Sequence, residues 1–119
     1  MDISDVVASL RSFSEERDWM QFHSPRNLVL ALVGEVGELA ELVQWRTDEE
    51  VRALATDPQT RDAVADELAD VFNYLVSLAD ELDIDLDDAV HRKIAKNAVK
   101  YPPHLARGTS AKYTELPDT

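Results

Sequence analysis

Apolar positions along the chain recur at spacings of three and four residues, which is the period of an amphipathic α-helix. The first such segment runs from about Ser4 to Asp18, with Val7, Leu10 and Phe13 on one side. The chain has only 3 glycines and few β-branched alternating runs. The pattern therefore predicts helix nearly throughout, and we expect an all-α fold, a bundle of four to five helices.

Helix start and stop signals divide the rest of the chain into further elements. Serine, threonine and aspartate are favoured as N-caps, and proline is favoured at the first helical position. The predicted elements are Ser24-Pro25 to about Trp45, a short helix from Thr47 with the capping-box spacing to Glu50, Asp57-Pro58 to about Leu82, and Asp85 to about Tyr101.

The end of the chain lacks these helical signals. Pro102 and Pro103 predict that the last helix stops near Tyr101, because proline cannot continue a helix. The residues that follow include Gly108 and Pro117. We therefore expect one domain over residues 1–119, helical to about residue 101, with 102–119 as an extended C-terminal tail.

Two of the predicted long helices each carry a pair of acidic residues three positions apart. Glu35 and Glu38 form one pair, and Glu67 and Asp70 form the other. This spacing places each pair on one stripe of its helix, so two such helices packed face to face would gather four carboxylates. An oxygen-only ligand set without histidine or thiol suits Mg²⁺, which keeps positions for water and substrate phosphates. The sequence thus indicates metal-assisted phosphoryl chemistry.

Glu35 falls inside the apolar arc of its helix and Glu38 lies at the edge of that arc, whereas Glu41 projects to the opposite side. A carboxylate on an apolar arc needs a metal, a cation or a raised pKa. The arc consists of Leu28, Leu32, Leu39, Leu42 and Val43. On the next long helix the expected core stripe consists of Val64, Leu68, Val71, Leu75, Leu78 and Leu82, with Tyr74 beside the carboxylates on its flank.

Polar side chains also occupy the predicted inner stripe of the last helix. Lys93, Asn97 and Lys100 share a stripe with Leu86 and Val90. Cations that face carboxylates are typical of a site for a metal–phosphate complex.

The charge of the chain restricts its partners. With 12 basic and 24 acidic residues the net charge is −12, which disfavours nucleic acid and anionic membranes and favours a small phosphate-bearing partner delivered with cations. No cysteine, basic leader or long apolar run is present, so we expect a cytoplasmic protein without disulfides. Residues 28–33, LVLALV, are apolar almost all round the helix, which predicts a homo-oligomer.

The motifs GEVGEL, DELADV and K93-x-x-x-N97-x-x-K100-Y101 resemble the MazG-type all-α nucleoside triphosphate pyrophosphohydrolases. The strings ERDWMQFHSPRNLVLALVGEVGELAELVQW, DELADVFNYLVSLA and KYPPHLARGTSAKYTELP are similar to the dCTP pyrophosphatase branch of that family. The resemblance implies Mg²⁺-dependent cleavage of a nucleoside triphosphate, dCTP or a modified dCTP, into a monophosphate and pyrophosphate. It also implies nucleotide-pool housecleaning and a dimer or dimer of dimers, a homotetramer, with sites at subunit boundaries.

The resemblance assigns roles to residues that are uninformative alone. From the residues alone, Trp19 and Trp45 are expected in the core or at an interface, and His23 is expected to be a surface or capping group. Arg107 and Lys112 would be ordinary solvated charges. By analogy Glu35, Glu38, Glu67 and Asp70 bind one or two Mg²⁺, Lys93 and Asn97 hold phosphates or the metal shell, Trp19, His23, Trp45 and Tyr74 line the base and sugar pocket, and Arg107, Lys112 and Tyr113 belong to a segment that folds over the site. Two positions depart from the pattern: Leu10 stands where vertebrate members of the branch have a pocket histidine, and Lys100 replaces an arginine.

In the expected mechanism a water molecule attacks the α phosphorus. Glu38 is the candidate base that orients the water, and Lys93 stabilises the charge of the leaving pyrophosphate. Two alternatives remain open from the residues. A noncatalytic acidic helical interaction module would bind no magnesium. A di-iron carboxylate protein would normally need Glu-x-x-His pairs, and the nearest match is Asp88-x-x-His91.

Overall fold

The computed structural model describes residues 1–118, and every regular element in that range is helical, which confirms the all-α fold class. The elements are α1 (Ile3–Glu16), a 3₁₀ turn (Met20–Phe22), α2 (Pro25–Val43), α3 (Asp48–Ala53), α4 (Pro58–Glu81), α5 (Leu86–Lys100), α6 (Pro103–Ala106) and a second 3₁₀ turn (Tyr113–Glu115). Within residues 1–118 no helix is both long enough and apolar enough to cross a membrane.

Contacts divide the chain into two compact units. The first comprises Met1–Ile84 and contains α1 to α4, and the second begins at Asp85 and contains α5 and α6. The assignment of a single domain over residues 1–119 stays a prediction. Each unit is described separately below.

The helix starts follow the capping signals in the sequence. The side chains of Ser24, Thr47, Asp57 and Asp85 each accept a hydrogen bond from a backbone N–H in the first turn of α2, α3, α4 and α5 respectively. Each of these bonds satisfies a donor that the helix itself leaves unpaired. The predicted helix starts are thereby confirmed, and the ends differ from the expectation by one or two residues.

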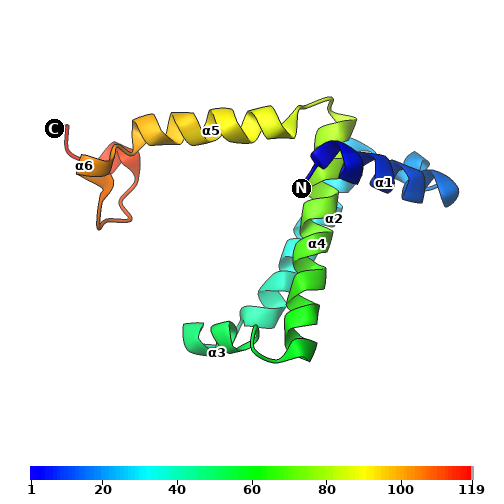
Figure 1. Cartoon of the computed structure of the whole chain (residues 1–119), viewed down its shortest axis with the longest axis horizontal. Coiled ribbons are helices and arrows are strands. Elements are labelled where there is room, and N and C mark those ends of the chain that lie inside the picture. The colour runs from blue at the N-terminus through cyan, green and yellow to red at the C-terminus, as the bar shows by residue number, and fades with distance from the viewer. Residues whose placement is uncertain (119) are drawn as a thin grey trace. The chain divides into compact units, whose positions relative to one another are not determined.

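The first unit is built on the packing of α2 against α4, which lie side by side (Figure 1). Figure 1 also shows α3 at the end of this pair where α2 stops and α4 begins. The core is small: Leu28 from α2 and Val76 and Ala79 from α4 are its buried apolar side chains. Burial of these side chains supplies the apolar free energy that holds the pair together.

The expected core stripe of α4 is wrong in part. Leu68, Leu75 and Leu82 are 53%, 39% and 49% exposed, while Val76 and Ala79 are buried instead. The apolar arc of α4 is broad, and a single copy of α2 covers only one part of it. Leu68, Leu75 and Leu82 form one edge of this arc and therefore remain on the surface of a single chain.

Helix α1 packs on the C-terminal part of α4. Arg11 Nε and Nη2 donate hydrogen bonds of 2.7 and 2.5 Å to the two carboxylate oxygens of Asp80. The chain leaves α1 through Asp18, whose φ of 55° lies in the left-handed region that aspartate tolerates better than most residues. This reversal allows the Trp19 N–H to donate to the Ser14 carbonyl at 2.9 Å, which directs the chain towards α2.

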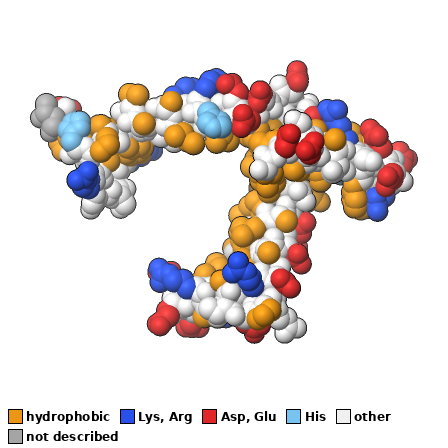
Figure 2. Space-filling model, in the orientation of Figure 1, with side chains coloured by type: hydrophobic (Ala, Val, Ile, Leu, Met, Phe, Trp, Pro, Cys, Tyr) orange, Lys and Arg blue, Asp and Glu red, His pale blue; other side chains and the backbone are white. Residues whose placement is uncertain are grey.

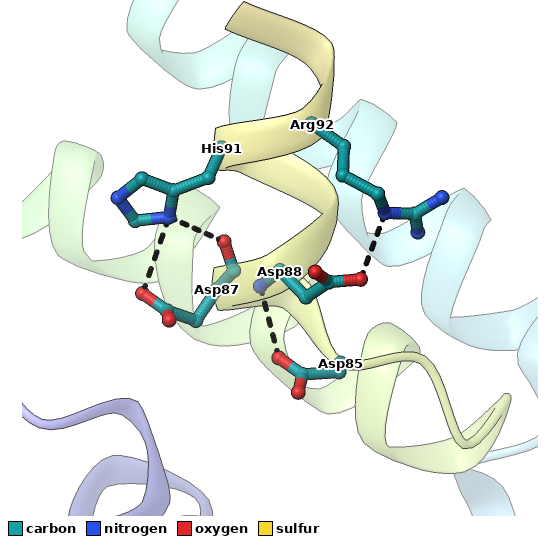
Figure 3. A network of polar contacts seen from close by, with 5 residues as sticks. All are labelled: Asp85, Asp87, Asp88, His91 and Arg92. Carbon is teal, nitrogen blue, oxygen red and sulfur yellow. Dashed lines mark hydrogen bonds and ion pairs between the residues drawn. The ribbon is translucent and has the colours of Figure 1, made fainter. Parts of the chain in front are cut away.

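In the second unit, α5 begins with a network of polar contacts (Figure 3). The Asp88 N–H donates to the capping carboxylate of Asp85 at 3.0 Å, and Arg92 Nε donates to Asp88 at 2.8 Å. His91 Nδ1 lies 2.7 Å from the Asp87 carbonyl oxygen. These contacts span one helical turn and support the first turns of α5.

The C-terminal segment contains two short helical elements, whereas the sequence predicts an extended tail. Pro102 and Pro103 end α5, but Pro103 then occupies the first position of α6, where a fixed φ and a missing N–H suit a helix. Beyond α6, Gly108 adopts a φ of 78° and the chain forms a second 3₁₀ turn at Tyr113–Glu115. The expectation of an extended tail over 102–119 is therefore wrong for these segments.

Candidate metal centre

Three carboxylates meet where α2 packs on α4. Glu35 and Glu38 come from α2 and Glu67 from α4, and one oxygen from each lies within 4.8 Å of the others. The spacing of three residues on α2 places both glutamates on the side that faces α4. The gathering of carboxylates predicted from the sequence is thus observed for these three residues.

Two of these side chains hold oxygens in an unfavourable environment. Oε2 of Glu35 and Oε2 of Glu67 are buried and have no hydrogen-bond partner among the residues that the structure describes. Leaving a buried acceptor unpaired costs roughly 1–3 kcal/mol, and more when the group is charged. The two oxygens therefore require a proton or a cation.

The electrostatics of the cluster agree with this requirement. Burial raises the pKa of Glu35 to about 7, with the negative charge of Glu38 as the next contribution. The pKa of Glu67 is also raised, again first by burial and then by Glu38. The further contributions to both pKa shifts come from neighbouring carboxylates, with Asp70 among them. Neighbouring carboxylates without a counter-charge disfavour one another in ionised form.

The donor set fits a hard divalent cation. Every candidate ligand atom is a carboxylate oxygen, and the two unpaired oxygens are available for coordination. A divalent ion would satisfy these oxygens and offset their mutual repulsion, as oxygen ligands do for Mg²⁺ and Ca²⁺. The residues present are therefore compatible with a resident metal ion.

Asp70 lies beside this cluster but outside the group of three. It is exposed on α4, one turn after Glu67, and its negative charge contributes to the raised pKa values of Glu35 and Glu67. Its role as a fourth ligand stays a prediction.

The aromatic residues assigned to the base pocket lie in different parts of the first unit. Trp19 is 44% exposed and contacts the Phe13 ring edge to face at 5.7 Å. His23 lines a cavity of about 20 Å³ together with Leu10 and residues of α4. Tyr74 is half-buried on α4, one turn beyond Asp70.

Trp45 is the most exposed of these aromatic residues, at 96%. Its φ of 68° is in the left-handed region, which is unfavourable for a bulky side chain. Exposure and backbone strain at one large aromatic residue are typical of a residue kept for binding rather than for stability. The grouping of Trp45 with Trp19, His23 and Tyr74 stays a prediction.

The remaining predicted site residues belong to the second unit. Lys93, Asn97, Arg107 and Lys112 are exposed there. Lys100 is also exposed on α5, and the expectation that Lys93, Asn97 and Lys100 face the carboxylates stays a prediction. Tyr113 is 42% exposed and contacts the end of α5. The binding roles of these residues stay predictions.

One feature of the first unit was not anticipated from the sequence. A cavity of about 290 Å³ lies between α2, α3 and α4, with Arg61 as its charged lining residue. The N-caps Thr47 and Asp57 predict where α3 and α4 begin. The cavity between α2, α3 and α4 depends instead on how the three helices pack together. Periodicity along one helix carries no signal for such a cavity.

The chain belongs to the MazG-like family, whose match covers residues 31–116. That range includes all four predicted carboxylate ligands together with Lys93 and Asn97. The resemblance inferred from the motifs is thus confirmed at the level of the family.

Within the family the chain is similar to curated mammalian proteins. It is 54% identical to dCTP pyrophosphatase 1 of Homo sapiens and 52% identical to that of Bos taurus, in each case over 97% of this chain and 68% of the relative. Among solved structures, a pyrophosphatase from Archaeoglobus fulgidus matches with a TM-score of 0.77 and 37% identity, over 83% of this chain and 91% of the other. The expected similarity to the dCTP pyrophosphatase branch is confirmed.

Proposed function

We propose that this chain hydrolyses dCTP, or a modified form of dCTP, to the nucleoside monophosphate and pyrophosphate. The observation that carries the proposal is the carboxylate cluster with its two unpaired buried oxygens, in a chain so similar to dCTP pyrophosphatase 1. In the reaction the oxygen of water bonds to the α phosphorus. The bond from that phosphorus to the α–β bridging oxygen breaks, and pyrophosphate leaves with the bridging oxygen.

The proposed metal ligands are Glu35, Glu38, Glu67 and Asp70, and the proposed metal is Mg²⁺, with one or two ions per site. Bound there, Mg²⁺ would neutralise part of the triphosphate charge and make the α phosphorus more electrophilic. The raised pKa values of Glu35 and Glu67 support this assignment, because they reflect burial and the repulsion of neighbouring carboxylates, both of which a bound cation would offset.

Glu38 is proposed to accept the proton of the attacking water. Of the three clustered carboxylates, Glu38 is the exposed one, so water reaches it most easily. A carboxylate in this position orients the water and accepts its proton as the bond to phosphorus forms. Lys93 is proposed to stabilise the charge that develops on the leaving pyrophosphate, and Asn97 to bind the phosphates.

We assign binding of the base and sugar mainly to aromatic side chains, because the chain resembles the family at these positions. Trp19, Trp45 and Tyr74 offer π-faces for stacking, which holds any base, and His23 offers hydrogen bonds that select among bases. Arg107, Lys112 and Tyr113 are proposed to close over the bound nucleotide from the C-terminal segment.

A homo-oligomer is part of the proposal. Val29, Leu30, Val33 and Val36 of α2 are 43%, 55%, 62% and 47% exposed, and Figure 2 shows hydrophobic side chains at the surface along α2 and α4. An apolar surface of this kind is typical of a subunit interface. We propose a dimer or a dimer of dimers with sites at the subunit boundaries, located in the cytoplasm and engaged in nucleotide-pool housecleaning.

The decisive experiment is incubation of the purified protein with a panel of deoxy- and ribonucleoside triphosphates, with Mg²⁺ or with EDTA. Magnesium-dependent formation of monophosphate and pyrophosphate is expected, fastest with dCTP or a 5-modified dCTP. Glu41→Gln is the matched control for ligand variants, because Glu41 is exposed on the same helix and outside the cluster. Absence of turnover with every triphosphate would contradict the proposal and favour a noncatalytic helical module.

A further inference from the structure

The ring of Tyr113 contacts two side chains from the end of α5. The ammonium of Lys100 lies 4.8 Å from the centroid of the Tyr113 ring. The ring of Tyr101 meets it edge to face, at 6.0 Å between centroids and an interplanar angle of 83°. Both distances are within the range of favourable cation–π and aromatic contacts.

These contacts connect the C-terminal segment to the helix within the second unit. Tyr113 begins the 3₁₀ turn, in which the Glu115 N–H donates to the Lys112 carbonyl at 2.8 Å and the Leu116 N–H donates to the Tyr113 carbonyl at 3.3 Å. Leu105, Ala111 and Leu116 are half-buried, so the segment also packs through apolar side chains. The ring contact thus holds a turn that has its own hydrogen bonds.

The charge of Lys100 has no acidic partner in the part of the chain that the structure describes, where the ion pairs of α5 are His91–Asp87 and Arg92–Asp88. The Tyr113 ring is therefore the group that Lys100 contacts through its charge. Lysine here replaces the arginine expected from the family pattern, and both cations can bind an aromatic face.

We propose that Lys100 is a positioning residue, which holds the C-terminal segment in place through the ring of Tyr113 so that the cations of that segment are pre-arranged for a triphosphate. Lys112 is adjacent to Tyr113, so fixing the ring fixes the backbone that carries Lys112. Arg107 directly follows α6, and its N–H donates to the Pro103 carbonyl at 3.1 Å. Along the chain it precedes the 3₁₀ turn that Tyr113 begins. The inference rests on the proposed function, because it requires Arg107 and Lys112 to bind phosphates.

If Lys100 holds the cations of the C-terminal segment in place, its loss should change KM rather than kcat. Ordering a loop on binding reduces affinity, and a segment already held in place avoids that loss. A phosphate ligand that acted in the transition state would instead lower kcat. The two roles of Lys100 therefore have different kinetic signatures.

The experiment compares Lys100→Met, Lys100→Arg and Lys96→Met in the full-length chain. Lys96→Met is the matched control, because Lys96 is exposed on the same helix one turn earlier and its loss changes the net charge equally. Two quantities are measured: amide hydrogen exchange at Glu115 and Leu116 in the absence of nucleotide, and KM and kcat for dCTP with Mg²⁺.

For Lys100→Met we expect exchange at both amides to accelerate roughly twofold to fivefold, and KM to rise by a similar factor with kcat unchanged. Lys100→Arg should restore both values and Lys96→Met should alter neither. Tyr113→Leu should accelerate exchange as Lys100→Met does, and the double variant should add little more, because both changes remove one contact.

Unchanged exchange in Lys100→Met would overturn the anchoring role. Faster exchange with an unchanged KM would overturn the link to substrate, and an equal rise of KM in Lys96→Met would reduce the effect to net charge. If the wild-type chain turned over no triphosphate, the proposed function would fail, while the exchange measurements would still report on the contact between Lys100 and Tyr113.

Discussion

Glu35 on α2 and Glu67 on α4 each bury one carboxylate oxygen where the two helices pack, and neither oxygen has a hydrogen-bond partner within residues 1–118. Glu35 and Glu67 lie 32 positions apart in the sequence. Burial raises the pKa of both groups. A stable protein retains such an arrangement when function requires it, because replacement by apolar side chains would stabilise the fold.

Substitution of Glu35 by glutamine should separate function from folding. Glu35→Gln keeps the shape of the side chain and removes its charge, so the helical fold should persist and its circular dichroism should match that of the wild type. Loss of one such electrostatic group typically lowers the rate by about 10²–10³, and we expect kcat for dCTP to fall by that factor. Wild-type activity in this variant, measured beside the Glu41→Gln control, would contradict the metal-ligand assignment.

The stability of the metal-free protein should fall as the pH rises from about 4.5 to about 7. The pKa of Glu35 is about 7 in the folded chain against an ordinary value of 4.5. The folded state therefore binds the proton more tightly than the unfolded state, so deprotonation favours unfolding over this range. Urea unfolding in EDTA across this range should show the decline, and Glu35→Gln should reduce its slope. A wild-type stability that increased through the same range would be inconsistent with the buried carboxyl.

Magnesium should stabilise the folded protein. A ligand that binds only the folded state at 100 times its Kd adds about 2.7 kcal/mol to the free energy of unfolding. We expect Tm to rise with MgCl₂ and to rise much less in Glu67→Gln, which loses a charged ligand. NaCl at matched ionic strength is the control, since it screens the carboxylates without coordinating them. Equal shifts in both salts would indicate screening alone.

A charge on the exposed apolar side of α2 should dissociate the proposed oligomer. Val33 is 62% exposed in one chain, so Val33→Glu should leave the helices folded. In a subunit interface the same carboxylate would be buried without a partner, which is strongly unfavourable. Light scattering should give a mass well above 13.4 kDa for the wild type and close to 13.4 kDa for the variant. A wild-type mass of one chain would refute the assembly.

Trp45 should show a conflict between stability and binding. Its φ of 68° is unfavourable for tryptophan but tolerated by asparagine, so Trp45→Asn should unfold at an equal or higher urea concentration. Loss of base stacking typically costs roughly 1–3 kcal/mol, so KM for dCTP should increase at least about fivefold. An unchanged KM would exclude Trp45 from the base pocket.

Much of the fold was predictable because its determinants are local. The caps at Ser24, Thr47, Asp57 and Asp85 act within one helical turn, so the sequence contains both the donor and the acceptor of each bond. The position of Glu35 on an apolar arc was predictable for the same reason. The C-terminal segment was less predictable, because prolines stop one helix and begin another with equal ease.

The sequence by itself determined that the chain is helical, where α2 to α5 begin, and that paired acidic residues share a helix stripe. Only the tertiary structure decided that Val76 and Ala79, rather than Leu68 and Leu75, enter the core, and that Glu35, Glu38 and Glu67 meet within 4.8 Å. The physical reason is that capping and periodicity depend on residues a few positions apart. Burial and the raised pKa of a carboxyl depend instead on which side of a second, distant helix packs against it.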